Sequence, residues 1–132
     1  MQRIMVTGAC GFLGRRVVSL GKDAGLRIVA TDLDKHAMAD PDVAYVPDAL
    51  RNVEQLSQWI DDTRPDAILH LAGCVRRDVE PDVWQACVEA NVTPLTNLLT
   101  AIAMLPAAQR PVLVVPGSQS EYGSAAMPWT EH

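Results

Sequence analysis

The sequence has few aromatic residues, few lysines and no long apolar run, and each scarcity excludes a class of protein. Aromatic side chains make up 5% of the 132 residues, and Lys22 and Lys35 are the only lysines. The net charge of −5 argues against a nucleic-acid-binding surface. No apolar segment approaches the roughly 20 residues that cross a bilayer. We therefore expect a protein with neither a nucleic-acid partner nor a membrane span.

Cysteine is also scarce, and the three cysteines have no spacing typical of a metal site. Because Cys10, Cys74 and Cys87 are odd in number, we expect reduced thiols, a cytoplasmic protein and no bound metal. Cys10 admits two interpretations: a redox sensor beside a cofactor or, as we favour, a small residue in a turn. The remaining composition, 48% apolar and 20% charged, fits a single globular domain.

What the sequence does have is a glycine motif near its start, V-T-G-A-C-G-F-L-G in residues 6–14. An apolar run precedes it and a helical pattern of apolar residues follows it. A strand, a glycine-rich turn and a helix N-terminus together bind pyrophosphate through backbone N–H groups. We expect Gly8 and Gly11 to adopt backbone angles closed to other residues. Gly14 should let the helix pack close to the strand.

An acidic residue lies at the distance from this motif that a dinucleotide site requires. The apolar strand of residues 27–31 ends at Asp32, 24 positions after Gly8. Dinucleotide-binding units carry an acid for the ribose hydroxyls at roughly 20 positions. The glycine motif and Asp32 together predict a dinucleotide site, and an ordinary strand-to-helix turn is the alternative.

The rest of the chain alternates strands and helices. The expected strands are residues 3–7, 27–32, 43–46, 67–72 and 112–115. The expected helices are residues 12–23, 53–63 and 82–105, the second capped by Asn52 and the third interrupted near residues 91–94 by Pro94. This alternation predicts an α/β fold: a Rossmann-like, doubly wound parallel sheet in three layers with strand order 3-2-1-4-5. The ligand should lie at the carboxyl ends of the first and fourth strands.

In this order the motifs resemble the N-terminal part of the extended short-chain dehydrogenase/reductase family, near its NAD-dependent sugar-nucleotide epimerases and dehydratases. Residues 7–14 resemble the loop T-G-x-x-G-[FY]-[IL]-G, and residues 70–73 resemble H-[LF]-A-[AG]. Residues 91–99 resemble the helix N-V-x-G-T-x-N-L-L, with Pro94 in place of glycine. Residues 115–123 resemble the S-S-x-x-V-Y-G run, and residues 128–131 resemble P-x-[ST]-E.

The resemblance implies a set of cofactor contacts and a preference for NAD over NADP. Asp32 would bind the ribose hydroxyls and repel a 2′-phosphate, although Lys35 nearby keeps NADP open. Asp48 would lie near the adenine, and Asn91 would order the helix break and a water, or cap a helix. The implied cofactor contacts are Gly8, Cys10, Gly11, Phe12, Leu13, Gly14, Asp32, Asp48, Ala49, Leu71, Ala72, Gly73 and Asn91.

Ser118 falls where the family holds its catalytic serine, four residues before Tyr122. The resemblance implies that its hydroxyl bonds the substrate oxygen that gains or loses a proton. Gly117 and Glu121 depart from the family pattern. Tyr122 and His70 are expected to be structural rather than an acid or a base.

The family's acid/base tyrosine, in a Y-x-x-x-K motif, has no counterpart in this sequence. Tyr45 and Tyr122 are the only tyrosines, and neither has a lysine four residues later. We therefore expect residues 1–132 to form an NAD(P)-binding Rossmann domain that is incomplete at its C-terminus and inactive alone. Three explanations stay open: part of a longer enzyme for nucleotide sugars, a non-catalytic NAD(H) sensor or scaffold, and a subunit completed by another chain. The resemblance also implies a homodimer through the helix near residues 97–105.

Overall fold

The sheet has the predicted strand order. The computed structural model describes residues 2–33, 40–75, 80–118 and 123–124. Five parallel strands lie in the order β3-β2-β1-β4-β5. They are β1 (Arg3–Thr7), β2 (Arg27–Thr31), β3 (Val43–Tyr45), β4 (Ala67–His70) and β5 (Val112–Val114). The predictions for Lys35, Glu121, Tyr122 and residues 128–131 concern positions outside the described residues.

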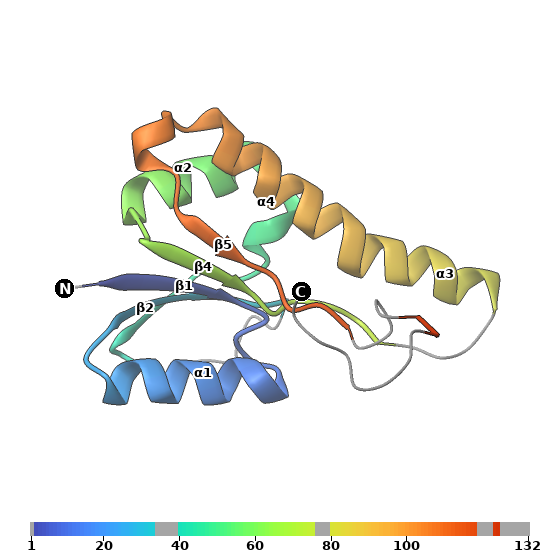
Figure 1. Cartoon of the computed structure of the whole chain (residues 1–132), viewed down its shortest axis with the longest axis horizontal. Helices are drawn as coiled ribbons and strands as arrows, with labels where there is room; N and C mark the ends of the chain where they lie inside the picture. The colour runs from blue at the N-terminus through green and yellow to red at the C-terminus, as the bar shows by residue number, and fades with distance from the viewer. Residues whose placement is uncertain (1, 34–39, 76–79, 119–122, 125–132) are drawn as a thin grey trace.

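Helices cover both faces of this sheet and make three layers (Figure 1). The helix α1 (Phe12–Asp23) lies on one face, and α2 (Val53–Thr63) and α4 (Thr93–Met104) lie on the other. The helix α3 (Pro81–Cys87) leads through a π-helical turn, η2 (Val88–Val92), directly into α4. Two short 3-10 turns, η1 (Ala49–Arg51) and η3 (Ala107–Gln109), complete the described elements. None of the described helices is long and apolar enough to cross a membrane.

Each face of the sheet buries its own core. The core against α2 and α4 includes the fully buried Met5, Leu56, Ile60, Ile68 and Leu98. The core against α1 includes Val6, Val18, Ile28 and Ala30. Successive strand residues point to opposite faces, so neighbours such as Met5 and Val6 belong to different cores. Burial on both faces explains why the central strands are almost continuously apolar.

Two helix ends form as the sequence predicts. Gly25 follows α1 with φ +75°, and its N–H donates to the Lys22 carbonyl at 2.8 Å. This is the left-handed helix end that glycine favours. At the start of α2, the Asn52 side chain accepts a hydrogen bond from the Gln55 N–H at 2.8 Å, as an N-cap should.

Several predicted strand ends were wrong, and so was one predicted helix interruption. The strands β2, β3 and β5 each end one residue before the expected position. β4 ends at His70 rather than at residue 72 because its neighbour β1 ends at Thr7, the partner of His70 in the ladder. The chain also stays helical through the interruption predicted near residues 91–94. Pro94 lies in the first turn of α4, where the missing N–H breaks little, and the π-helical turn before it accommodates the change.

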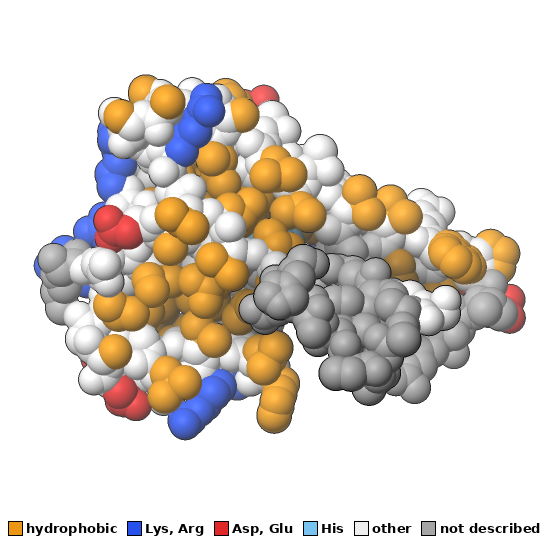
Figure 2. Space-filling view, in the orientation of Figure 1, with side chains coloured by type: hydrophobic (Ala, Val, Ile, Leu, Met, Phe, Trp, Pro, Cys, Tyr) orange, Lys and Arg blue, Asp and Glu red, His pale blue; other side chains and the backbone are white. Residues whose placement is uncertain are grey.

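The strand β5 forms an edge with exposed apolar side chains. Val112 is 64% exposed and Val114 is 49% exposed, whereas Leu113 between them packs against the core under α2 and α4. Hydrophobic side chains gather on the face where β5 lies in front (Figures 1 and 2). The helix α1 packs on β1 and β2, so the two halves of the described sheet are covered unequally.

Candidate dinucleotide-binding site

The glycine loop between β1 and α1 is packed so closely that two of its glycines have no room for a side chain. Gly8 has φ +66°, and a Cβ there would lie 2.6 Å from the backbone nitrogen of Ala72. A Cβ on Gly14 would overlap the carbonyl oxygen of Gly8 and lie 2.7 Å from the Ala9 Cα. The path of this loop is therefore set by the first turn of α1 and by the chain that leaves β4.

Gly11 does not need the special backbone conformation that we predicted for it. Its φ of −70° and ψ of 174° are extended and open to any residue. A Cβ at this position would meet only the Gly8 carbonyl oxygen, at 3.2 Å. Gly11 is exposed as well. A larger side chain here would press on that oxygen and occupy the space in front of the loop.

The first turn of α1 is open to an anion. No described side chain caps the helix at Gly11, and its first turn contains no acidic residue. The first N–H groups of any helix lack intrahelical partners and carry partial positive charge. Phe12 is 93% exposed and Leu13 is 57% exposed, so this end of the helix is accessible. The arrangement suits a phosphate group.

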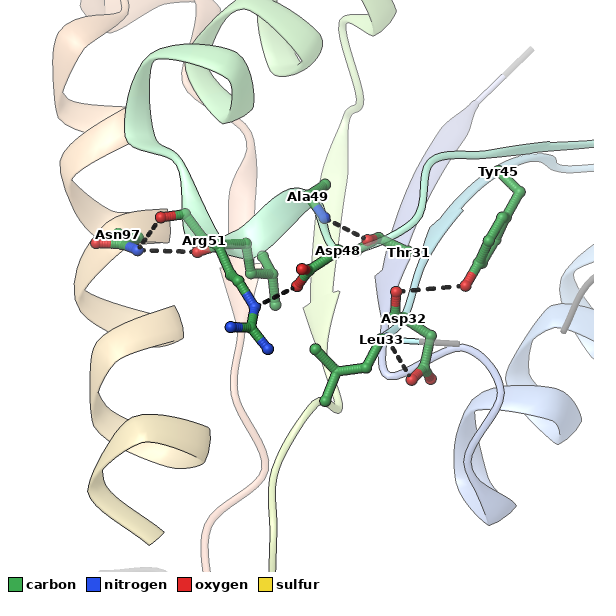
Figure 3. Close-up of polar contacts among 9 residues, drawn as sticks. Thr31, Asp32, Leu33, Tyr45, Asp48, Ala49, Arg51 and Asn97 are labelled. Carbon is green, nitrogen blue, oxygen red and sulfur yellow. Dashed lines mark hydrogen bonds and ion pairs between the residues drawn. The ribbon is translucent and has the colours of Figure 1, made fainter. Parts of the chain in front are cut away.

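Asp32, just after β2, is bonded to the glycine loop. Its Oδ2 accepts a hydrogen bond from the Cys10 N–H at 2.8 Å, and its Oδ1 accepts one from the Leu33 N–H at 2.7 Å. The hydroxyl of Tyr45 donates to the Asp32 carbonyl at 3.3 Å (Figure 3). A carboxylate oxygen accepts more than one hydrogen bond, so Asp32 has capacity left for ribose hydroxyls.

Asp48 lies beside Asp32, in the turn that follows β3. It adopts a left-handed conformation with φ 54° and ψ 29°. Its N–H donates to the Asp32 carbonyl at 2.7 Å, and the next N–H, that of Ala49, donates to Thr31 Oγ1 at 3.2 Å. Arg51 Nε donates to Asp48 Oδ1 at 2.8 Å (Figure 3). The structure thus brings the two predicted acids together at the carboxyl edge of the sheet.

Thr7 and His70 form a buried polar pair beneath the glycine loop. Thr7 is fully buried, His70 is 4% exposed, and their Oγ1 and Nδ1 atoms lie 2.8 Å apart. The Ala72 N–H also donates to Thr7 Oγ1, at 3.3 Å. Burial lowers the pKa of His70, so the ring is neutral near pH 7. This enclosed position agrees with the structural role predicted for the histidine.

Asn91 caps no helix, and the helix continues through the break that we predicted there. The water that we predicted beside Asn91 stays a prediction. From the π-helical turn, its Oδ1 accepts a hydrogen bond from the Cys74 N–H at 2.7 Å, and its Nδ2 donates to the Cys74 carbonyl at 2.9 Å. A Cβ on Gly73 would lie 2.9 Å from the Asn91 Oδ1. Gly73 therefore leaves room for an amide clamp on the loop that follows β4.

A second amide clamp, formed by Asn97, was not predicted from the sequence. Asn97 on α4 donates from Nδ2 to the carbonyls of Leu50 and Arg51, at 2.9 and 3.4 Å. The family-like helix pattern includes this asparagine, but the pattern names no partner for it. Its acceptors lie 47 and 46 positions earlier in the chain, and only the fold brings them together.

Ser118 follows β5 at the same edge of the sheet and is exposed. Because β5 pairs with β4, this serine leaves the sheet beside the strand that carries the residue 71–75 loop. Its catalytic contact stays a prediction. Among the residues that the structure describes, no three His, Cys, Asp or Glu side chains gather to hold a metal ion.

Comparison with known sequences identifies relatives of this chain. The family model described as "NAD dependent epimerase/dehydratase family" matches residues 4–132. The CDP-paratose 2-epimerase of Salmonella typhi is 28% identical over an alignment of 109 residues that covers 76% of this chain and 32% of that protein. The chain thus spans about a third of the length of this curated relative.

Solved structures share the fold. An oxidoreductase of the short-chain dehydrogenase/reductase family from Burkholderia thailandensis is 26% identical with a TM-score of 0.78, covering 94% of this chain and 54% of that one. The UDP-glucose 4-epimerase of Thermus thermophilus, solved in complex with NAD, is 25% identical with a TM-score of 0.67, covering 76% of this chain and 33% of that one.

Proposed function

The chain belongs to the NAD-dependent epimerase/dehydratase family, and on that premise we propose that it binds NAD as part of an oxidoreductase for nucleotide sugars. The observation that carries the proposal is the glycine loop joined to Asp32. The loop presents an uncapped helix N-terminus, and the Cys10 N–H within it bonds the Asp32 carboxylate at 2.8 Å. One element suits a pyrophosphate and the other suits the adjacent ribose, so their junction matches a dinucleotide.

The same carboxylate favours NAD over NADP. Both Asp32 oxygens accept backbone N–H groups, which fix the position of the carboxylate beside the glycine loop. A negative carboxylate accepts the two ribose hydroxyls but repels a 2′-phosphate. Asp48, whose Oδ1 is held by Arg51, is placed to accept a hydrogen bond from the amino group of adenine. The remaining predicted contacts belong to the glycine loop, the first turn of α1, η1, the chain after β4 and η2.

The reaction that we propose for the intact enzyme is hydride transfer at a sugar carbon. The names of the relatives support this substrate class, since one is a CDP-paratose 2-epimerase and another is a UDP-glucose 4-epimerase. When bound, NAD supplies the hydride acceptor. Ser118 would hold the reacting hydroxyl of the sugar through a hydrogen bond. Hydride transfer at a sugar carbon is compatible with an epimerase, a dehydratase or a reductase, and the proposal includes all three.

A non-catalytic NAD(H)-binding sensor or scaffold is the second candidate. The observation that favours it is the sequence itself: neither Tyr45 nor Tyr122 is followed four residues later by lysine. These 132 residues contain no Y-x-x-x-K pair, the motif whose phenol the family uses to move the hydroxyl proton. A chain of this sequence that binds NADH but converts no nucleotide sugar would support the second candidate.

Self-association forms part of the proposal. The helices α3 and α4 and the π-helical turn between them expose apolar side chains at intervals close to helical repeats. These side chains are Trp84, Val88, Val92 and Leu99. An apolar helical stripe of this kind supports a homodimer, which sedimentation of the purified chain would measure.

The binding proposal is tested by titrating NADH into the wild-type chain and into Gly11→Val. The isopropyl group should fill the space in front of the loop, on an extended backbone whose added Cβ would lie 3.2 Å from the Gly8 carbonyl oxygen. We expect NADH fluorescence to report binding to the wild type and loss of binding in the variant, and we expect thermal melting to show that the variant still folds. The control is Ala107→Val in the exposed turn η3, at the opposite end of the sheet. Equal NADH affinity in Gly11→Val and wild type would refute the assignment of this loop.

A further inference from the structure

The turn that carries Asp48 is hydrogen-bonded to a side chain of α4. Asn97 Nδ2 donates to the Leu50 carbonyl at 2.9 Å and to the Arg51 carbonyl at 3.4 Å (Figure 3). The asparagine is partly buried. Both acceptors are main-chain groups within η1, the 3-10 turn that begins one residue after Asp48. A single amide on a long helix therefore fixes the backbone next to a predicted cofactor contact.

The backbone is strained at Asp48, the residue that precedes η1. Asp48 has φ 54°, and a left-handed conformation costs a residue other than glycine about 1 kcal/mol or more. On the side facing β2, its N–H bonds the Asp32 carbonyl and the Ala49 N–H bonds Thr31. On the opposite side, Asn97 supplies the hydrogen bonds. The turn is thus held between β2 and α4.

The hydrogen bonds also link Asn97 to the Asp48 carboxylate. Asn97 bonds the Arg51 carbonyl, and the Nε of Arg51 bonds Asp48 Oδ1 at 2.8 Å. The guanidinium sets the direction of the carboxylate, and the amide sets the position of the arginine backbone. Among the described residues, the other oxygen, Oδ2, has no hydrogen-bond partner, so it is left to accept one from a ligand.

We propose that Asn97 is a positioning residue for the adenosine end of NAD, acting through Arg51 and Asp48. The inference rests on the proposed NAD function. The adenine 6-amino group is a donor, and a carboxylate is its complement. Asn97 would act through its hydrogen bonds to η1, and its effect would be to aim the Asp48 carboxylate at that donor. Loss of its amide should weaken recognition of the amino group specifically.

The test compares NAD with nicotinamide hypoxanthine dinucleotide, which has a carbonyl oxygen where adenine has its amino group. In the wild type, Oδ2 meets a donor in NAD and an acceptor in the analogue. Hydrogen bonds to charged groups are worth about a tenfold or larger difference in affinity, so we expect the wild type to prefer NAD by about that factor. Asn97→Leu, which keeps the volume and removes the amide, should lower this preference to about twofold.

The ratio of the two affinities separates positioning from general damage, because a merely structural loss weakens both ligands equally. The control is Thr100→Val, which removes a hydroxyl from the same helix. Within the described part of the chain, this hydroxyl bonds only the Thr96 carbonyl, at 2.8 Å. This control should keep the wild-type ratio. Asn97→Ala, with the best helix propensity, serves if the leucine variant does not fold.

Each outcome of this test supports or overturns either the inference or the proposed function. Loss of discrimination in an Asn97 variant that still binds NAD would support the inference. A wild type that discriminates, beside Asn97 variants that discriminate equally, would overturn it and leave the proposed function intact. A wild type that binds both dinucleotides equally would also overturn it. A wild type that binds neither dinucleotide would overturn the proposed function.

Discussion

The glycine loop and the Asp48 turn lie at the same edge of the sheet, yet different forces hold them. In the glycine loop, main chain packs against main chain, and a methyl group on Gly8 or Gly14 would strike backbone atoms. In the Asp48 turn, the contacts include hydrogen bonds with side chains: Thr31 accepts one, and Arg51 and Asn97 donate others. Steric contact between backbone atoms fixes the glycine loop, whereas hydrogen bonds fix the Asp48 turn.

The difference predicts how each region responds to substitution. Backbone atoms in close contact have nowhere to move, so a single added carbon affects the whole loop. A turn held by several hydrogen bonds loses them one at a time, at about 1 kcal/mol each. The glycine loop should therefore fail abruptly, and the Asp48 turn should weaken in steps.

Gly14→Ala should give the largest effect. Glycine inside a helix is ordinarily less stable than alanine, so a replacement at an open helical position would stabilise the chain. Here the new Cβ would overlap the Gly8 carbonyl oxygen and press on Ala9. We expect the free energy of unfolding, measured in urea, to fall by about 3 kcal/mol.

The matched control for Gly14→Ala is Gly25→Ala. Gly25 has φ +75°, but a Cβ there meets no atom within 4 Å. Its replacement therefore carries only the conformational cost of about 1 kcal/mol. If Gly14→Ala raised the stability or cost no more than Gly25→Ala, close packing would not be what fixes the glycine loop.

Asn52→Ala should give a smaller effect, in the other region. Asn52 follows η1 directly and caps α2 through its bond to the Gln55 N–H at 2.8 Å. Loss of the cap should lower the free energy of unfolding by about 1 kcal/mol. The control is Gln58→Ala on the exposed face of α2, which should stay within about 0.5 kcal/mol of wild type. A loss as large as that of Gly14→Ala would remove the contrast between the two regions.

The same contrast explains what the sequence could predict. The bounds of α1, the strand order and the Asn52 cap follow from local rules: apolar periodicity, alternation of elements and a polar residue before a helix. Positions such as Gly8 follow from a motif, because backbone crowding demands glycine wherever it occurs. For Gly11 the predicted backbone conformation was wrong, since its backbone is extended, and its contact with the cofactor stays a prediction.

The two amide clamps could not be predicted because their partners are backbone groups brought near by folding. Asn91 bonds Cys74, 17 positions earlier, and Asn97 bonds the turn after β3, 46 and 47 positions earlier. A backbone acceptor has no sequence signature, so neither bond appears in any pattern of residue types. The π-helical turn could not be predicted either, because Pro94 indicates a disturbance of the helix without specifying its form.

The smallest predicted effect concerns His70, the one titratable group in the buried pair beneath the glycine loop. Burial lowers its folded-state pKa below the ordinary 6.5, so below that pH the unfolded chain binds more protons than the folded one. Stability contributed by the neutral ring is complete above about pH 6.5 and is lost as the pH falls. Between pH 7 and 6 the loss should be no more than about 0.7 kcal/mol, and His70→Asn, which cannot titrate, should show a correspondingly shallower dependence in urea unfolding. Parallel pH dependences for wild type and His70→Asn would mean that this histidine contributes nothing to the support of the loop through its charge state.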